Sequence, residues 1–167
     1  FVNPKAGFRF KAMYDLGGDV WGLNLGGITF SRFSLMHSRY YSLFRSQVFA
    51  FRAFGGVYNK QSSTTTFETE KFSLGGANSL RGYREFFKYG NYRLSMNLEQ
   101  RFPINQNILG VLFYDSGFID DTFDDLFNDY YYGYGFGFRW LNTFMPIRLD
   151  FAKGNEFMIH LGLSQTF

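Results

Sequence analysis

The sequence predicts an all-β protein, an antiparallel transmembrane β-barrel of about eight strands formed as a single domain over residues 1–167. Aromatic and polar residues alternate along most of the chain, which is the pattern of strands whose two faces meet different surroundings. Phe (24) and Tyr (12) are abundant although the mean hydropathy is −0.20, as expected where every second strand residue is polar and faces a lumen. No stretch approaches about 18 consecutive apolar residues, so we predict no transmembrane helix.

Composition and isolated residues argue against an enzyme or a metal protein. Cysteine is absent, which excludes disulfides, thiolate metal sites and a cysteine nucleophile. His37 and His160 lie far apart in the sequence and Ser79 has no histidine at a motif-like spacing, so we predict no catalytic residue, no metal site and no cofactor. The net charge of +3 is better explained by lumen lining and membrane-edge anchoring than by nucleic-acid binding.

Three strands are expected before the centre of the chain, at residues 7–16, 28–36 and 43–58. The first alternates regularly, with aromatic residues on one face and charged residues on the other. We place a polar turn at residues 37–40. In a continuous strand Arg45 and Gln47 would lie on the same face as Phe49. We therefore expect either a bulge near Val48 or that the register assigned to this strand is wrong.

After the centre the alternation is sharper and indicates five strands, at residues 92–102, 108–118, 132–140, 147–152 and 156–167. In the strand at 132–140, aromatic residues alternate with Gly133, Gly135, Gly137 and Arg139. Glycine along one face fits a strand that meets lipid outside and something closely packed inside.

Connection lengths alternate as in a barrel with long outer loops and short inner turns. The longer connections are at 17–27, 59–91 and 119–130, and the shorter ones are at 37–41, 103–107 and 142–146. The tight turn at 153–155 is an exception. An even number of strands places both termini on the periplasmic side. The chain begins at Phe1 without the pattern of a signal peptide. We therefore expect it to be a mature or trimmed product.

The centre of the chain, residues 72–83, reads FSLGGANSLRGY and lies within the longest connection. A polar stretch at 59–71 precedes it and is too long for a hairpin turn. Loops of this length are usually functional or disordered. We expect the glycine-punctuated segment to fold back into the barrel lumen.

FSLGGANSLRGY resembles the motif of the BamA-like outer-membrane assembly factors, the superfamily of BamA, TamA, mitochondrial Sam-type proteins and two-partner secretion transporters. Further matches follow in the family's order: LEQRFPI at 98–104, FYDSG at 113–117, GYGFGFRW at 133–140, PIRLDFA at 146–152, and a final strand ending at Phe167. The resemblance covers the whole chain as the C-terminal half of such a barrel. It implies insertion or assembly of outer-membrane proteins, or polypeptide translocation, through a lateral seam between the first and last strands. The alternative is a passive outer-membrane anchor or pore for an upstream working domain.

The resemblance also implies a loop-docking site. In the family an Arg-Gly-Phe/Tyr tripeptide lies at the tip of a long loop tucked into the barrel, which corresponds here to Arg81, Gly82 and Tyr83. Glu99 and Asp115 are the implied lumen partners of the arginine. An arginine buried in a narrow lumen needs a carboxylate to offset its desolvation.

The remaining implications concern the C-terminus and the partners. Gly162 and Phe167 are the implied C-terminal strand signal, and Gln165 stands where the family usually has an apolar residue. The implied partners are outer-membrane lipid and client outer-membrane proteins. The implied location is integral to the bacterial outer membrane, without enzymatic activity.

Lumen crowding predicts a further partner, a second copy of the chain. A barrel of about eight strands is only wide enough for its own side chains, and this one would also hold residues 72–83. Its inward cations would be Arg9, Lys11, Arg93, Arg101, Arg139 and Arg148. We therefore expect a homodimer in which residues 7–16 meet residues 156–167 of the other copy, giving about sixteen strands. A self-closed small barrel and a half cut from a longer chain are the alternatives.

Overall fold

The computed structural model describes residues 4–17, 30–60, 68–141 and 146–163. Eight strands form one sheet, in the spatial order β1 (Gly7–Gly17), β2 (Phe30–Ser42), β3 (Val48–Lys60), β6 (Tyr92–Pro103), β7 (Ile108–Asp120), β8 (Tyr131–Trp140), β9 (Ile147–Lys153) and β10 (Phe157–Leu163). Every neighbouring pair is antiparallel. The predicted all-β class and the eight antiparallel strands are confirmed. Within the described ranges, no helix is long and apolar enough to cross a membrane.

The connection between β2 and β3 corrects the prediction. β2 continues through the turn predicted at 37–40 and ends at Ser42, and the chain then turns through the 3-10 helix Phe44–Ser46. The pairing of β2 with β3 is unbroken, so there is no bulge near Val48. The predicted bulge was wrong, and the alternative, a wrongly assigned register, is correct, because Arg45 belongs to the turn and its position says nothing about the faces of the strand that follows.

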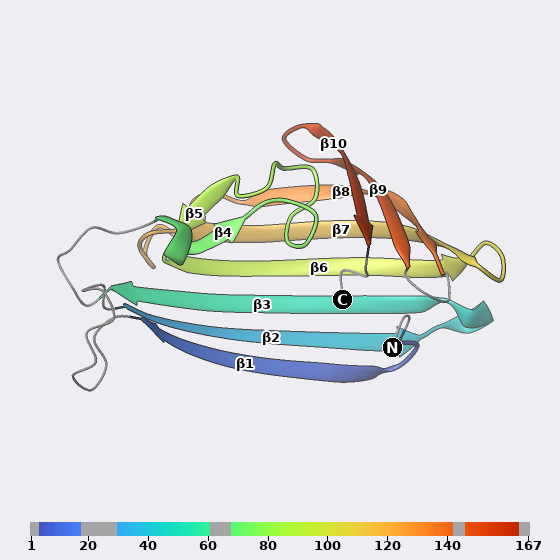
Figure 1. Cartoon of the computed structure of the whole chain (residues 1–167), viewed down its shortest axis with the longest axis horizontal. Coiled ribbons are helices and arrows are strands. Elements are labelled where there is room, and N and C mark those ends of the chain that lie inside the picture. The colour runs from blue at the N-terminus through green and yellow to red at the C-terminus, as the bar shows by residue number, and fades with distance from the viewer. Residues whose placement is uncertain (1–3, 18–29, 61–67, 142–145, 164–167) are drawn as a thin grey trace.

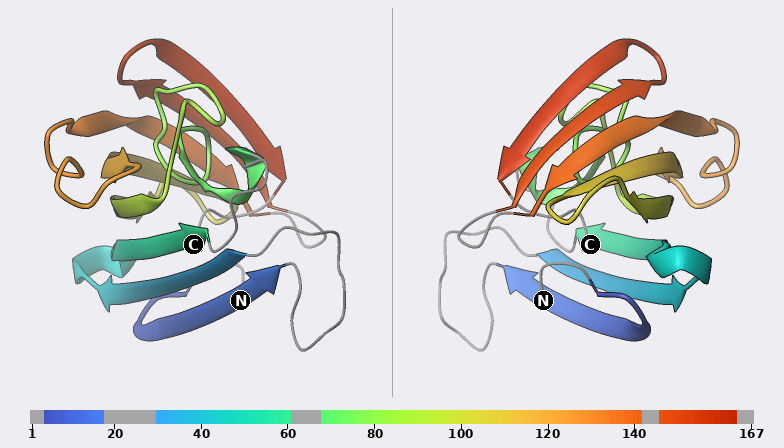
Figure 2. Two further views of the ribbon diagram at one scale, coloured as in Figure 1. Left: turned by 90° about the vertical axis from the view of Figure 1, so that its left-hand side faces the viewer. Right: turned by 90° about the vertical axis from the view of Figure 1, so that its right-hand side faces the viewer.

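A second, two-stranded sheet divides the connection predicted at 59–91. β4 (Phe72–Leu74) pairs with β5 (Lys88–Gly90), and a second 3-10 helix, Glu68–Glu70, precedes β4. The large sheet curls into a trough, and Figure 1 and Figure 2 show β4, β5 and the chain between them on its concave side. The sequence predicted that this segment folds back into the lumen, but it did not predict the strand pair that frames it.

The strands place apolar side chains outside the trough and polar ones inside. In β8 the outward residues are exposed aromatics: Tyr132, Tyr134, Phe136, Phe138 and Trp140. In β6 the inward residues Ser95, Asn97, Glu99 and Arg101 are buried. The predicted faces of both strands are confirmed. Soluble proteins bury apolar side chains and expose charged ones, whereas this sheet exposes an apolar band and encloses charged side chains. This distribution fits lipid on the outside of the sheet.

β1 and β10 are the two edges of the sheet, and in the described part of the chain each pairs with a neighbour on one side only. β1 is exposed on both faces from Gly7 to Tyr14. The last strand was predicted over 156–167 and is described from Phe157 to Leu163, so Phe167 lies outside the described residues. As far as the described residues show, the trough is therefore open between its two edges.

Candidate functional site

The segment at 72–83 folds into a compact turn. After β4, Gly75 and Gly76 take positive φ angles of 119° and 89°, and Gly76 forms an isolated bridge with Leu80. The Ser79 hydroxyl accepts a hydrogen bond from the Gly75 N–H at 3.0 Å and donates one to the Gly75 carbonyl at 2.7 Å. These bonds satisfy buried backbone groups within the turn and present Arg81 to the sheet.

An apolar cluster holds the segment against the sheet. Its buried members come from the segment, from β3 and from β7: Phe72, Leu74, Leu80, Tyr83, Tyr58 and Ile119. The Tyr83 ring also lies edge-on to Phe87 and Tyr131, at centroid distances of 4.8 and 6.0 Å. Edge-to-face pairs contribute about 0.5–1.5 kcal/mol beyond area burial. The tyrosine of the predicted tripeptide is therefore an apolar anchor.

Arg81 binds carboxylates on two neighbouring strands. Its Nε and Nη2 donate to the two oxygens of Asp115 in β7 at 2.7 and 2.8 Å, and its backbone N–H donates to the same carboxylate at 3.1 Å. Its Nη1 donates to Glu99 in β6 at 2.8 Å. A bidentate contact fixes the orientation of a guanidinium as well as its charge. The structure thus brings together the arginine and both carboxylates that the resemblance implied.

This group is shielded from water. Arg81 and Asp115 are 0% exposed and Glu99 is 1% exposed, and the Arg81 guanidinium lies 3.5 Å above the centre of the Phe113 ring. Burial alone would lower the pKa of Arg81, but the carboxylates of Asp115 and Glu99 outweigh it and raise that pKa above its ordinary value. Arg81 is therefore a permanent cation, and loss of a partner would leave a buried charge uncompensated.

The three residues belong to a larger buried cluster of four arginines and three carboxylates: Arg81, Arg101, Arg139, Arg148, Glu99, Asp115 and Asp150. Arg101 donates to Glu99 through Nε and Nη2 at 3.0 and 2.9 Å. Asp150 of β9 accepts from both terminal nitrogens of Arg139 and lies 3.4 Å from Arg81 Nη1. Four positive and three negative charges leave the cluster with one excess positive charge.

Two glycines allow the tripeptide to approach the sheet closely. Gly82 has a φ of 91°, and a Cβ on it would lie 2.5 Å from the backbone nitrogen of Gly154, in the turn between β9 and β10. Gly133 of β8 lies directly under the carbonyl oxygen of Arg81, where a Cβ would overlap it. The Glu156 N–H also donates to the Gly82 carbonyl at 3.2 Å. The tripeptide is thus fastened to the β9–β10 turn as well as to β6, β7 and β8.

Three members of this site were not predicted. Arg139 was expected only as one of several inward cations, and Asp150 stood only within the PIRLDFA match. Asn97, the third, donates to Asp115 at 2.8 Å and to the Ser79 carbonyl at 2.7 Å. Two of them stand within the PIRLDFA and GYGFGFRW matches. Treating every inward charge within those matches as part of the cluster would have found them.

The predicted C-terminal strand signal stays a prediction. Gly162 lies in β10, where an added Cβ would meet Arg148 Nε at 3.4 Å, and Phe167 lies outside the described residues. In the described part of the chain, no group of three or more His, Asp or Glu side chains is placed to hold a metal ion.

A buried Arg-Gly-Tyr segment on the concave face of an antiparallel sheet is the arrangement that the resemblance implied. The family model of the Omp85 superfamily domain matches residues 1–167, the whole chain. The chain belongs to the Omp85 superfamily. This Omp85 chain is thus a member of a superfamily of integral outer-membrane β-barrels concerned with protein assembly and translocation.

Among solved structures, the Omp85 chain is similar to BamA from Haemophilus ducreyi lacking POTRA domains 1–3, with a TM-score of 0.73 and 19% sequence identity. The match covers 96% of this chain and 39% of the BamA chain. At this identity the likeness establishes the fold, and the chain spans well under half of the BamA structure that it matches. No curated protein sequence matches the chain significantly.

Proposed function

We propose that this Omp85 chain inserts or assembles outer-membrane proteins, or translocates a polypeptide, at a lateral seam formed by its edge strands. Family membership supports the class of activity. The structural observation that carries the mechanism is that β1 and β10 each pair on one side only in the described chain. Unpaired backbone N–H and C=O groups cost several kcal/mol each in lipid, so such an edge favours pairing with a strand of a client protein.

In this proposal the docked tripeptide sets the position of one edge. Gly82 accepts the hydrogen bond from Glu156, the residue just before β10, and Arg84 lies 3.8 Å from the Glu156 carboxylate. Arg81 meanwhile holds the same segment to β6 and β7. The β9–β10 turn is thereby tied to the middle of the sheet, which limits how far the β10 edge swings.

We further propose that a second copy completes the sheet in the outer membrane, so that the lateral seam is the junction between β1 of one copy and β10 of the other, with both termini on the periplasmic side. The exposure of β1 on both faces supports this arrangement, because no described residue covers its inward cations. An even number of antiparallel strands supports the placement of the termini.

Crosslinking tests the homodimer. Phe10 and Leu161 are outward-facing and 61% and 75% exposed on the two edge strands. Cysteines at both positions should form crosslinks between copies in mild detergent, whereas a cysteine at Phe136, in the middle of the sheet, should form none. A strictly monomeric mass with crosslinks only within one chain contradicts the dimer and supports self-closure or a longer parent chain.

Stimulated folding tests the proposed activity. Liposomes containing the protein are mixed with an unfolded small outer-membrane β-barrel, and client folding is followed by gel mobility. We expect faster folding than in empty liposomes, loss of the effect in Arg81→Ala, and retention in the control Arg32→Ala. Folding no faster than in empty liposomes contradicts the proposal. Ion conductance without stimulated folding supports the alternative of a passive pore, and neither activity supports a passive anchor.

A further inference from the structure

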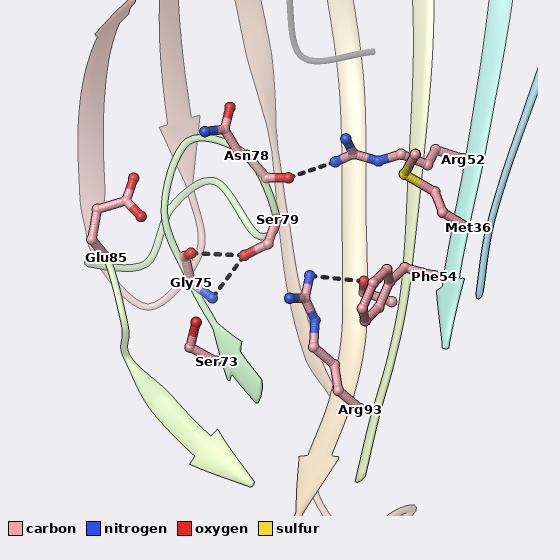
Figure 3. A pocket seen from close by; sticks show the side chains of 10 residues that line it. Met36, Arg52, Phe54, Ser73, Gly75, Asn78, Ser79, Glu85 and Arg93 are labelled. Carbon is pink, nitrogen blue, oxygen red and sulfur yellow. Dashed lines mark hydrogen bonds between the residues drawn. The ribbon is translucent and has the colours of Figure 1, made fainter. Parts of the chain in front are cut away.

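A cavity of about 290 Å³ lies between the docked segment and the sheet. Figure 3 shows that its walls come from two sources: β4 and the turn that follows it, with Ser73 and Gly75, and strands β3 and β6, with Arg52 and Arg93. The volume is close to the lower end of the range of about 300–1,000 Å³ for small-molecule sites. It is large for an ordered water and small for a peptide segment.

Arg93 is a half-buried cation with no carboxylate close to it among the described residues. Its guanidinium lies 4.6 Å from the centre of the Phe54 ring, and its Nη2 donates to the Ser95 hydroxyl at 3.1 Å. Its Nε is buried and has no hydrogen-bond acceptor. Among the described residues, no carboxylate lies within 4.0 Å of it. An Nε–H that is buried without an acceptor costs free energy, and a negative group that enters the cavity would offset this cost.

The cavity as a whole has an excess of positive charge. Arg52 is its second cation, oriented by Asn97 at 2.8 Å and by the Asn78 carbonyl at 2.5 Å. Among the described residues that line it, the only carboxylate is that of Glu85, which accepts a hydrogen bond from the Ala77 N–H at 2.8 Å. Two cations and one carboxylate leave one net positive charge. Arg93 contrasts in this respect with Arg81 and Arg101, which both have carboxylate partners.

We propose that this cavity binds a small oxyanion of the phosphate class, with Arg93 as its principal ligand. A phosphate presents several acceptor oxygens, which suit the free Nε of Arg93 and the approach of two guanidinium groups. The Ser73 hydroxyl, which faces the cavity from the docked segment (Figure 3), supplies a donor from the opposite wall. Because the ligand contacts both the segment and the sheet, its binding stabilises the docked state of the segment.

Two sources share this chemistry, free phosphate and the phosphate of a lipid headgroup. The test uses the purified protein in an uncharged detergent and measures its thermal unfolding midpoint. Inorganic phosphate is titrated at constant ionic strength, and mixed micelles containing phosphatidic acid form the second arm. We expect a saturable rise in the midpoint and slower protease cleavage at residues 59–71. A rise with the lipid alone identifies the headgroup as the source.

Variants assign the effect to the cavity. Arg93→Gln should weaken the apparent affinity at least about tenfold, as loss of a hydrogen bond to a charged group predicts. Without phosphate this variant should unfold no earlier than the parent, because the substitution removes an unpaired charge. Ser73→Ala changes the opposite wall without touching the barrel strands, and it should also weaken the response.

Arg9→Gln is the matched control. It makes the same change of charge on the inward face of β1, in an exposed position outside the cavity, and should leave the response to phosphate unchanged. The proposal is overturned if neither phosphate source shifts the midpoint, or if Arg93→Gln and Arg9→Gln respond as the parent does.

Discussion

The concave face of the sheet has a covered half and an uncovered half, and the same residue types behave differently in the two. Under the docked segment, Arg139 of β8 and Asp150 of β9 form an ion pair with side chains 2% and 0% exposed. Toward the uncovered β1 edge, where the cover ends with the Phe72 ring 5.7 Å from the Arg32 guanidinium, Arg32 of β2 and Asp15 of β1 pair at 3.1 Å, but their side chains are 33% and 43% exposed. Strand alternation turns all four residues inward, whereas only the segment determines which pair loses its water.

This difference has energetic consequences. An exposed ion pair contributes about 0–1 kcal/mol because water and salt screen it. Removing one partner of a buried pair costs about 3–5 kcal/mol because the remaining charge is uncompensated. Substitutions in the covered half should therefore destabilise the protein far more than matched substitutions in the uncovered half.

The largest effect is expected for Arg81→Ala. In the described chain Arg81 is the only cation within 4.0 Å of Asp115, and its loss also leaves a cavity beside Phe113. We expect the free energy of unfolding in detergent to fall by about 3–5 kcal/mol and protease cleavage at residues 59–71 to accelerate. The control Arg32→Ala removes the exposed pair and should cost less than about 1 kcal/mol. Similar losses of unfolding free energy in the two variants would show that the covering segment does not determine how much each ion pair contributes.

Asp150→Asn should be the next most damaging change. It leaves four arginines with two carboxylates, and Arg139 retains only Glu99, at 3.6 Å. We expect a loss of about 2–3 kcal/mol in denaturant titration, because buried charged groups become under-satisfied. Asp15→Asn is the control in the uncovered half and should change stability by less than about 1 kcal/mol. If the Asp150→Asn variant is as stable as its control, Asp150 does not contribute to the stability of the buried cluster.

Gly82→Ala tests the close approach of the cover itself. The positive φ of 91° and the backbone of Gly154, 2.5 Å from an added Cβ, both oppose the substitution. Strain of this kind costs about 1–3 kcal/mol, visible as a lower unfolding midpoint. Gly55→Ala on the outer face of β3 is the control. Its Cβ would meet only a Leu94 methyl group at 3.3 Å, and the midpoint should hardly move.

The smallest effect is expected at the rim, where Lys88 of β5 lies 3.4 Å from Asp120 and 3.3 Å from Asp129. Partial burial would lower the pKa of Lys88, but hydrogen bonds with Tyr131 and Asp129 outweigh it and raise that pKa. A lysine whose pKa is raised in the folded protein contributes stability at pH values below its ordinary pKa. This contribution is lost as the pH rises through the raised pKa. Lys88→Ala should therefore cost less than about 1 kcal/mol at neutral pH, and its difference from the parent should vanish in strongly alkaline titrations.

The sequence by itself determined the strands and their faces, because alternation with a period of two is a local property of the backbone. The aromatic and glycine faces of β8, and the apolar and charged faces of β6, follow directly from it. The turn after β2 was missed because no glycine, proline or asparagine marks residues 43–47, where Ser46 takes a φ of 61°. Ordinary residues there adopt a conformation that tertiary context imposes.

The tertiary structure alone decided which inward charges meet. Arg81 lies 34 residues before Asp115 and 69 before Asp150, and sequence spacing carries no information on pairs formed across a curved sheet. It also decided that the cover lies over β3 to β9 and leaves β1 bare, because that depends on the apolar cluster that contains Tyr83 and Tyr58 and on the approach of Gly82 to the β9–β10 turn. Burial, and with it the energy of each ion pair, is a property of the assembled trough and its covering segment rather than of any single strand.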